Sequence, residues 1–209
     1  MLGLYPIFDL GPSLDVARAP ALLEAAIDAG IRVVQLRAKA LGAGAFLECA
    51  RQLAPIAQAH GVDLIINDRP DIASLSGARG VHLGQDDLPP SVARRLLPAP
   101  ALIGVSTHDL RQVAAAKAEG VADYLGFGPV FPTRSKERPD AVVGLDGLRD
   151  AVRAAAPLPV VAIGGIDEER LTAVRATGAS GAAVISAFMS APDPASALRQ
   201  LVRRWREEG

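Results

Sequence analysis

Short apolar runs alternate with longer stretches of helical period along this chain of 209 residues. The apolar runs lie at 4–9, 32–37, 62–68, 80–83, 101–106, 123–128, 159–165 and 181–186. The helical stretches between them include 19–29, 43–60, 109–119, 144–156, 167–177 and 193–207. Near-continuous apolar runs are typical of parallel strands that are covered on both faces. Eight such strands, nearly all followed by a helix, predict an α/β fold, the (β/α)8 barrel.

A doubly wound open sheet is the structural alternative. It usually has fewer strands, and its dinucleotide-binding form carries a GxGxxG motif after the first strand, which is absent from that position here. No linker, low-complexity tract or charge block divides the chain. We therefore expect one catalytic barrel domain over residues 1–209.

Composition excludes several classes of partner. The formal net charge of -1 gives no global attraction to nucleic acid or to a membrane surface. The single cysteine, Cys49, cannot form an internal disulfide, which favours a reducing compartment. No apolar run approaches the roughly 18 residues that a membrane-spanning helix needs. We expect a cytoplasmic protein, and the sequence leaves its oligomeric state open, with a homo-oligomer among the options.

Polar residues collect where the predicted strands end. In chain order they are Gln35, Arg37, Lys39, Asn67, Asp68, Gln85, Asp86, Asp87, Ser106, Thr107, His108, Thr133, Ser135, Lys136, Gly164, Gly165 and Ser186. In a barrel of this class these ends all face one rim, where such enzymes carry their active sites. The opposite rim has no comparable collection. This asymmetry predicts an active site at the carboxyl ends of the strands.

Two segments of this rim have the groups that anions bind. Gln35, Arg37 and Lys39 recur at period two, so an extended segment points them the same way, which suits a pyrophosphate or a carboxylate. The segment 133–136 offers two hydroxyls and two cations in a row. The alternative for both segments is a charged loop that is merely solvated.

Carboxylates end two adjacent predicted strands. Asp68 follows one strand and the pair Asp86 and Asp87 follows the next, and neighbouring strands lie about 4.8 Å apart. Two carboxylates together with phosphate oxygens and waters form a usual Mg²⁺ site. The alternative is that Asp68 and Asp86 cap the helices that follow them. Spacing does not choose between Asp86 and Asp87.

Other rim features are less specific. Gly164 and Gly165 would let backbone N–H groups approach a phosphate, helped by the next helix N-terminus, or they serve only a tight turn. His82 lies inside a predicted strand and fits a barrel-interior residue better than a catalyst. His108 lies at the rim but also reads as part of a helix start. No cluster of histidine and cysteine indicates zinc, and Cys49 has no visible catalytic partner.

The ordered segments "QLRAK", "LIINDRPDIA", "GVHLGQDDLP", "IGVSTHD", "GFGPVFPTRSK", "AIGGI" and "VISAF" resemble the thiamine phosphate synthase family. They run from residue 35 to residue 188, so the resemblance covers nearly the whole chain. It implies a transferase of thiamine biosynthesis that acts on two small molecules. The enzyme would join a hydroxymethylpyrimidine diphosphate to a thiazole phosphate and release pyrophosphate, with Mg²⁺ as the cofactor.

The resemblance also implies a role for each matching position. The pyrimidine diphosphate would be held by Gln35, Leu36, Arg37, Ala38, Lys39, Asn67, Ser106 and Lys136. The thiazole phosphate would be held by Thr133, Arg134, Ser135, Gly165, Ile185 and Ser186, although Arg134 is more simply a solvated loop residue. Asp68 and Asp87 would bind Mg²⁺, and Arg37, Ser106 and Lys136 would assist the departing pyrophosphate. Ser135 replaces a commoner threonine, and Asp9 receives no role.

Two alternatives remain beside the synthase. A thiazole tautomerase relative shares the barrel but, as this branch is understood, carries a histidine where Pro129 stands, and it would not need the full set of cations and carboxylates. A non-catalytic phosphate-binding barrel would bind without turnover. We also predict that loop 132–143 closes over the substrates as a lid.

Overall fold

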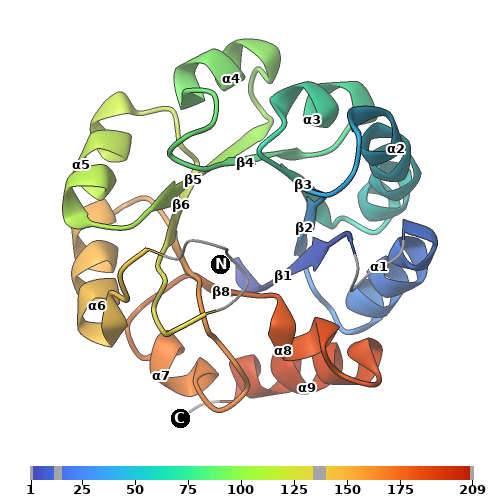
Figure 1. Cartoon of the computed structure of the whole chain (residues 1–209). Coiled ribbons are helices and arrows are strands. Elements are labelled where there is room, and N and C mark those ends of the chain that lie inside the picture. The colour runs from blue at the N-terminus through green and yellow to red at the C-terminus, as the bar shows by residue number, and fades with distance from the viewer. Residues whose placement is uncertain (1, 12–15, 134–139, 208–209) are drawn as a thin grey trace.

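Eight parallel strands close into one barrel, in the order in which they occur along the chain (Figure 1). This computed structural model describes residues 2–11, 16–133 and 140–207. The strands are β1 (Gly3–Asp9), β2 (Val33–Arg37), β3 (Asp63–Asn67), β4 (Gly80–Leu83), β5 (Leu102–Thr107), β6 (Tyr124–Phe127), β7 (Val160–Ala162) and β8 (Gly181–Val184). β1 pairs with β8 as well as with β2, which closes the ring and confirms the predicted (β/α)8 barrel.

Helices follow the strands and form an outer ring (Figure 1). They are α1 (Ala19–Asp28), α2 (Ala43–Ala59), α3 (Pro70–Ser76), α4 (Pro90–Leu96), α5 (Leu110–Glu119), α6 (Gly144–Ala155), α7 (Leu171–Arg175), α8 (Ser186–Met189) and α9 (Pro194–Arg206), with a short 3-10 turn at Val16–Arg18. Asp109 caps α5, because its side chain accepts a hydrogen bond from the N–H of Gln112. Cys49 is buried in α2, within the helix predicted over residues 43–60.

The predicted boundaries around the seventh strand are wrong. The apolar run 159–165 is strand only over β7, and the helix predicted from residue 167 begins at Leu171. Gly164 and Gly165 have positive φ angles, 99° and 62°, which a strand does not accommodate. The chain therefore turns at these glycines, although the composition of the run resembles a longer strand.

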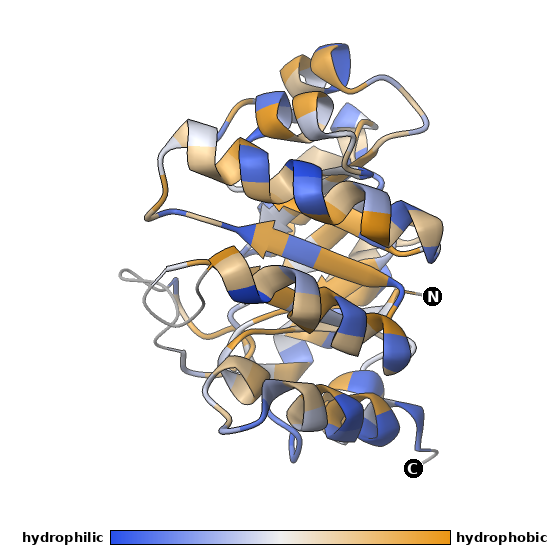
Figure 2. Ribbon diagram, turned by 90° about the vertical axis from the view of Figure 1, so that its right-hand side faces the viewer, coloured by the Kyte–Doolittle hydropathy of each residue, from blue (hydrophilic) through white to orange (hydrophobic). Residues whose placement is uncertain are grey.

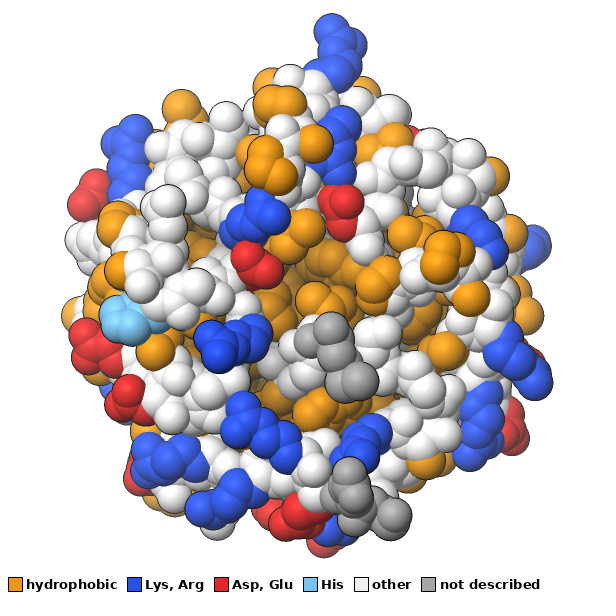
Figure 3. Space-filling view, turned by 180° about the vertical axis from the view of Figure 1, so that it is seen from behind, with side chains coloured by type: hydrophobic (Ala, Val, Ile, Leu, Met, Phe, Trp, Pro, Cys, Tyr) orange, Lys and Arg blue, Asp and Glu red, His pale blue; other side chains and the backbone are white. Residues whose placement is uncertain are grey.

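The two ends of the barrel differ in character. In Figure 2 the chain begins at the side that faces away from the viewer of Figure 1. Figure 3 shows that side, where the parallel strands begin: hydrophobic side chains fill the centre and charged ones surround it. None of the described helices is long and apolar enough to cross a membrane.

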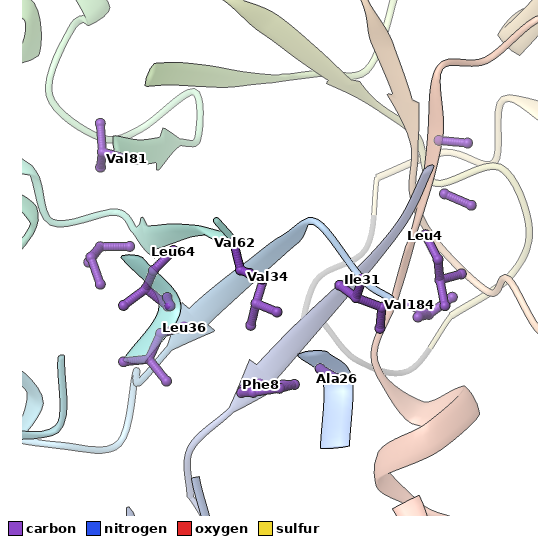
Figure 4. Close-up of a cluster of buried hydrophobic side chains, with 14 of the residues drawn as sticks. Leu4, Phe8, Ala26, Ile31, Val34, Leu36, Val62, Leu64, Val81 and Val184 are labelled. Carbon is purple, nitrogen blue, oxygen red and sulfur yellow. The ribbon is translucent and has the colours of Figure 1, made fainter. Parts of the chain in front are cut away.

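Alternation along each strand divides the apolar side chains into two sets. Those pointing outward form the larger cluster together with apolar residues of the helices. Figure 4 shows part of it, with Phe8, Val34 and Leu36 of the strands and Ala26 of α1. Those pointing inward form a second, smaller cluster that includes Tyr5, Val33 and Tyr124. Because side chains alternate at period two, the residues that end a strand on its inner face enter the mouth of the barrel.

Candidate active site

A cavity of about 420 Å³ opens at the carboxyl ends of the strands, and all eight strands contribute to its lining. The lining includes eleven of the residues to which the resemblance gives a role: Gln35, Arg37, Lys39, Asn67, Asp68, Asp87, Ser106, Thr133, Gly165, Ile185 and Ser186. It also includes four other residues of the predicted rim, Gln85, Asp86, His108 and Gly164. The side chains of Leu36 and Ala38 do not line it and instead join the outer apolar layer. Arg134, Ser135 and Lys136, and half of the predicted lid, lie outside the described residues.

The three residues at period two on β2 and just after it do face one cavity, but their settings differ. Gln35 is buried and its amide donates to the hydroxyl of Tyr5 at 3.1 Å. Arg37 forms an ion pair with Asp9 of β1 at 2.5 Å, which gives Asp9 a definite partner. Lys39 is more exposed and its ammonium lies 3.3 Å from a carboxylate oxygen of Asp68. Arg37 is thus held in place, whereas Lys39 is tied mainly to the carboxylate cluster.

Two carboxyl groups from adjacent strands meet in the cavity. The backbone of Asp68 has φ 63°, rare for a residue other than glycine, and its N–H donates to the carbonyl of His82 at 2.8 Å. The N–H of Gly84 donates to Asp87 at 2.6 Å. Burial, and next the adjacent Asp68 carboxyl, raise the pKa of Asp87, against the effect of the Gly84 hydrogen bond. A cation placed between the two carboxylates would relieve this repulsion.

The helix-cap interpretation of these carboxylates is wrong. The N-cap positions of α3 and α4 are Arg69 and Pro89, and neither helix start has a side-chain cap hydrogen bond. Asp86 is exposed, whereas Asp87 adjoins Asp68. Both residues line the cavity, and Asp87 is the one that lies against Asp68. Within the described ranges no group of three or more histidine, cysteine, aspartate or glutamate side chains could hold a metal, so a cation here would have two protein carboxylates.

His82 and His108 differ in environment. His82 is an interior residue, as predicted, with Nδ1 3.1 Å from the hydroxyl of Tyr124 and Nε2 2.9 Å from the hydroxyl of Ser106. Burial lowers the pKa of His82 to about 4, so the ring is neutral near pH 7. His108 Nδ1 donates to the carbonyl of Gly128 at 2.6 Å, and its Nε2 lies 3.5 Å from Asp140. His108 therefore ties the start of α5 to the segments on either side of residues 134–139.

The part of the rim after β6, β7 and β8 is shaped by close backbone packing. A Cβ atom on Gly165 would lie 2.4 Å from the carbonyl oxygen of Pro132, and one on Gly164 would lie 2.5 Å from the Cα of Pro129. These glycines therefore form a tight turn, and their predicted approach to a phosphate stays a prediction. Ser186 is the first residue of α8. The N–H groups of Phe188 and Met189 donate to the carbonyl of Ile185, and those of Ser186 and Ala187 have no acceptor within the helix. The helix after the glycine turn, α7, begins only at Leu171, whereas α8 begins directly after β8, at the rim of the cavity.

Several cavity residues were not predicted from the sequence. Tyr5, Tyr124, Gln112 and Asp140 all contribute to the lining. The tyrosines have a usable signal, because each sits on the inward face of its strand by period-two alternation. Gln112 and Asp140 lie on a helix and in a loop, where no such period indicates direction.

An open cavity at the carboxyl rim, with cations, paired carboxylates and a glycine turn, defines a (β/α)8-barrel enzyme that acts on phosphorylated small molecules. The chain matches the sequence model of the thiamine monophosphate synthase family over residues 4–188 and belongs to that family. As its relatives are, it is a transferase of thiamine biosynthesis.

The relatives support this assignment over nearly the full length. The chain is 45% identical to the thiamine-phosphate synthase of Chloroflexus aurantiacus over 95% of this chain and 90% of that one. It is 46% identical to the enzyme of Anaeromyxobacter dehalogenans, covering 95% and 86% of the two chains. The structure of thiamine phosphate pyrophosphorylase from Pyrococcus furiosus superposes with a TM-score of 0.86 at 35% identity, covering 98% and 95%. Sequence and fold therefore agree on the family.

Proposed function

We propose that the chain joins 4-amino-2-methyl-5-hydroxymethylpyrimidine diphosphate to a thiazole phosphate in a Mg²⁺-dependent substitution that gives thiamine monophosphate and pyrophosphate. The observation that carries the metal dependence is that the carboxyls of Asp68 and Asp87 lie together. Burial and the Asp68 carboxyl raise the pKa of Asp87. Two carboxylates with room for phosphate oxygens is the donor set that Mg²⁺ commonly takes. When bound there, Mg²⁺ would neutralise charge on the diphosphate.

The diphosphate would lie between the carboxylate cluster and the cations of β2. Arg37 and Lys39 line the same cavity as Asn67 and Ser106, which offer neutral hydrogen-bonding groups. Because the Asp9 ion pair holds Arg37, the guanidinium can donate to phosphate oxygens with little loss of side-chain entropy. Lys136 would contribute a further cation, as the family resemblance implies, and Leu36 and Ala38 would contribute through their backbones.

The thiazole phosphate would occupy the other side of the cavity. Thr133 and Ser186 bring hydroxyls, and Gly165 with Ile185 brings backbone that approaches the cavity closely. Ser135 and Arg134 would extend this set. The first-turn N–H groups of α8 suit an anion because they combine unsatisfied donors with the positive end of the helix dipole.

This arrangement suits a dissociative substitution. The C–O bond between the pyrimidine methylene and the diphosphate breaks, its electron pair leaves with pyrophosphate, and the thiazole nitrogen then forms the new C–N bond. Such a reaction needs donors where negative charge develops and two substrates held in line, rather than a strong base. The cations of β2 meet the first need, and the two-sided cavity meets the second.

The test is pyrophosphate release by the purified protein, given both substrates together and then each alone, with Mg²⁺ and with EDTA. Release that requires both substrates and the metal is expected. Release without the metal would contradict the carboxylate assignment. No release, with the thiazole phosphate isomerised or merely bound, would replace the synthase with the tautomerase or the binding protein.

A further inference from the structure

Five polar side chains form an unbroken row of hydrogen bonds across the barrel interior. Gln35 of β2 donates to Tyr5 of β1 at 3.1 Å, and the hydroxyls of Tyr5 and Tyr124 lie 2.8 Å apart. Tyr124 of β6 lies 3.1 Å from Nδ1 of His82 on β4, and Nε2 of His82 lies 2.9 Å from the hydroxyl of Ser106 on β5. The row thus starts and ends at two residues assigned to the pyrimidine diphosphate.

Two glycines leave the space that this row occupies. A Cβ atom on Gly104 would lie 2.1 Å from the Tyr124 ring and 2.5 Å from Nδ1 of His82. A Cβ atom on Gly126 would lie 3.1 Å from the His82 ring. Both glycines are on the inward faces of their strands, next to the side chains they accommodate. The row is therefore built into the shape of the barrel wall and does not result from one flexible side chain.

The protons in the row have one consistent direction. An amide nitrogen only donates, so the Tyr5 oxygen accepts from Gln35, and the Tyr5 hydroxyl is left to donate a hydrogen bond to Tyr124. Tyr124 in turn donates to Nδ1 of His82, and the Nε2–H of the neutral ring donates to Ser106. The reverse direction would leave the Tyr5 proton without an acceptor among the described residues, which is costly in a buried site.

We propose that Tyr5, Tyr124 and His82 are positioning residues. They hold the Ser106 hydroxyl as a hydrogen-bond donor toward the cavity, and they hold the side-chain amide oxygen of Gln35 there as an acceptor. Since Ser106 already accepts from His82, its own proton is left for an acceptor atom of the substrate. Since the Gln35 nitrogen is engaged with Tyr5, its oxygen is left for a substrate donor. This inference rests on the proposed function, because the substrate is the pyrimidine diphosphate.

A double-mutant cycle tests whether Tyr124 acts through Ser106. Ser106→Ala, Tyr124→Phe and the double variant are compared with the wild type in kcat and in KM for the pyrimidine diphosphate. Tyr124→Phe removes the hydroxyl that fixes His82 and is expected to lower kcat/KM about tenfold, roughly the effect of one buried hydrogen bond. In the Ser106→Ala background it is expected to cause no further loss, because the group it positions is gone.

The matched control is Thr107→Val, which removes a buried hydroxyl from the same strand. Thr107 donates to the carbonyl of Gly126 at 2.9 Å and does not line the cavity. It is expected to lower the melting temperature about as much as Tyr124→Phe but to leave kcat/KM near that of the wild type. Losses for Tyr124→Phe and Ser106→Ala that multiply in the double variant would overturn the proposal, as would equal losses in the control.

Two further measurements keep the outcome interpretable. If Tyr124→Phe does not fold, the same cycle is run at the other end of the row with Tyr5→Phe and Gln35→Ala, where the same non-additivity is expected. Binding of the pyrimidine diphosphate alone is measured by calorimetry for each variant. Coupled binding losses in a protein without turnover would reject the proposed function and keep the positioning row. Turnover in the wild type, with losses that are independent in the double variant, would keep the proposed function and reject the positioning row.

Discussion

The two halves of the cavity rim differ in the groups that they offer to an anion. The charged half follows β2 to β5 and carries Arg37, Lys39, Asp68 and Asp87. The glycine half follows β6 to β8 and is built from the turn at 164–165 with the start of α8. In the charged half, side-chain charge provides the chemistry. In the glycine half, the closeness and conformation of the backbone provide it.

This difference predicts different failures. Substitution in the charged half removes a charge and leaves the backbone in place, so activity is lost while the fold is kept or even stabilised. Substitution in the glycine half pushes backbone segments apart, so stability and binding are lost together. Substitutions at Asp87, Gly165 and Asp9 test this contrast.

The largest effect is expected for Asp87→Asn. Because the pKa of Asp87 is raised in the folded protein, the fold favours the protonated carboxyl. The free energy of unfolding therefore falls as pH rises and Asp87 becomes ionised. The neutral amide should therefore increase the metal-free melting temperature, while turnover falls about 10²- to 10³-fold with the loss of a metal ligand. Thermal melting and pyrophosphate release with a Mg²⁺ titration measure both.

The control for that variant is Asp86→Asn, one residue away. Asp86 is exposed, and we assign it no role in binding or catalysis. Its substitution is expected to change neither the melting temperature nor the Mg²⁺ dependence. An unchanged Mg²⁺ response in Asp87→Asn together with a lost response in Asp86→Asn would reverse the assignment of the two carboxylates.

Gly165→Ala is expected to have the next largest effect. The new methyl would meet the Pro132 carbonyl at 2.4 Å in a backbone with positive φ. We expect a loss of about 1–3 kcal/mol in unfolding free energy and a KM for the thiazole phosphate raised about tenfold or more. The KM for the pyrimidine diphosphate should change much less. Urea unfolding and steady-state kinetics with each substrate varied provide the comparison.

Gly61→Ala separates backbone conformation from crowding. Gly61 has φ +64°, close to that of Gly165, but nothing lies within 4 Å of its Cβ position. It should lose stability from conformation alone and keep both KM values. If Gly61→Ala and Gly165→Ala gave the same kinetics, the close approach of the two loops would have no part in binding.

Asp9→Asn tests whether the ion pair with Asp9 positions Arg37 in the charged half, and a smaller effect is expected. The change removes the ion pair that orients Arg37 and leaves Arg37 itself. We expect the KM for the pyrimidine diphosphate to rise about threefold to tenfold, the range of a partly exposed ion pair, with the other KM unchanged. Asp63→Asn, which breaks the ion pair of Asp63 with Arg79 outside the cavity, is the control and should leave both constants alone.

The smallest effect is expected for Cys49, which lies buried in α2 within the outer apolar layer, and it concerns stability at high pH. Burial raises its pKa to about 11 from an ordinary value of 9.0, so the neutral thiol is favoured in the fold. That stabilisation is complete below pH 9 and is lost as pH rises toward 11, about 1 kcal/mol of it by pH 10. Urea unfolding at pH 8 and pH 10 should show a smaller decrease for Cys49→Ala than for the wild type. An equal decrease would place the thiolate in a solvated setting.

Much of the fold was predictable because strand and helix follow local pattern. The strand at 80–83 has the predicted bounds, and the period-two residues Gln35, Arg37 and Lys39 reach one cavity. The end of β7 was not predictable, since an apolar run with two glycines reads as strand until their φ angles are known. Roles on 134–136 stay predictions, as does the lid.

Periodicity along single elements was enough to predict the barrel, its polar rim and the kinds of chemical group at that rim. The neighbours of each side chain came from the closed barrel, which placed Asp87 against Asp68, gave Asp9 a partner and joined Tyr5 to Tyr124 across 119 positions of sequence. Those outcomes depend on which strands become neighbours and on how far each side chain reaches into shared space. No local pattern encodes such distances, because they are set by the closure of the barrel.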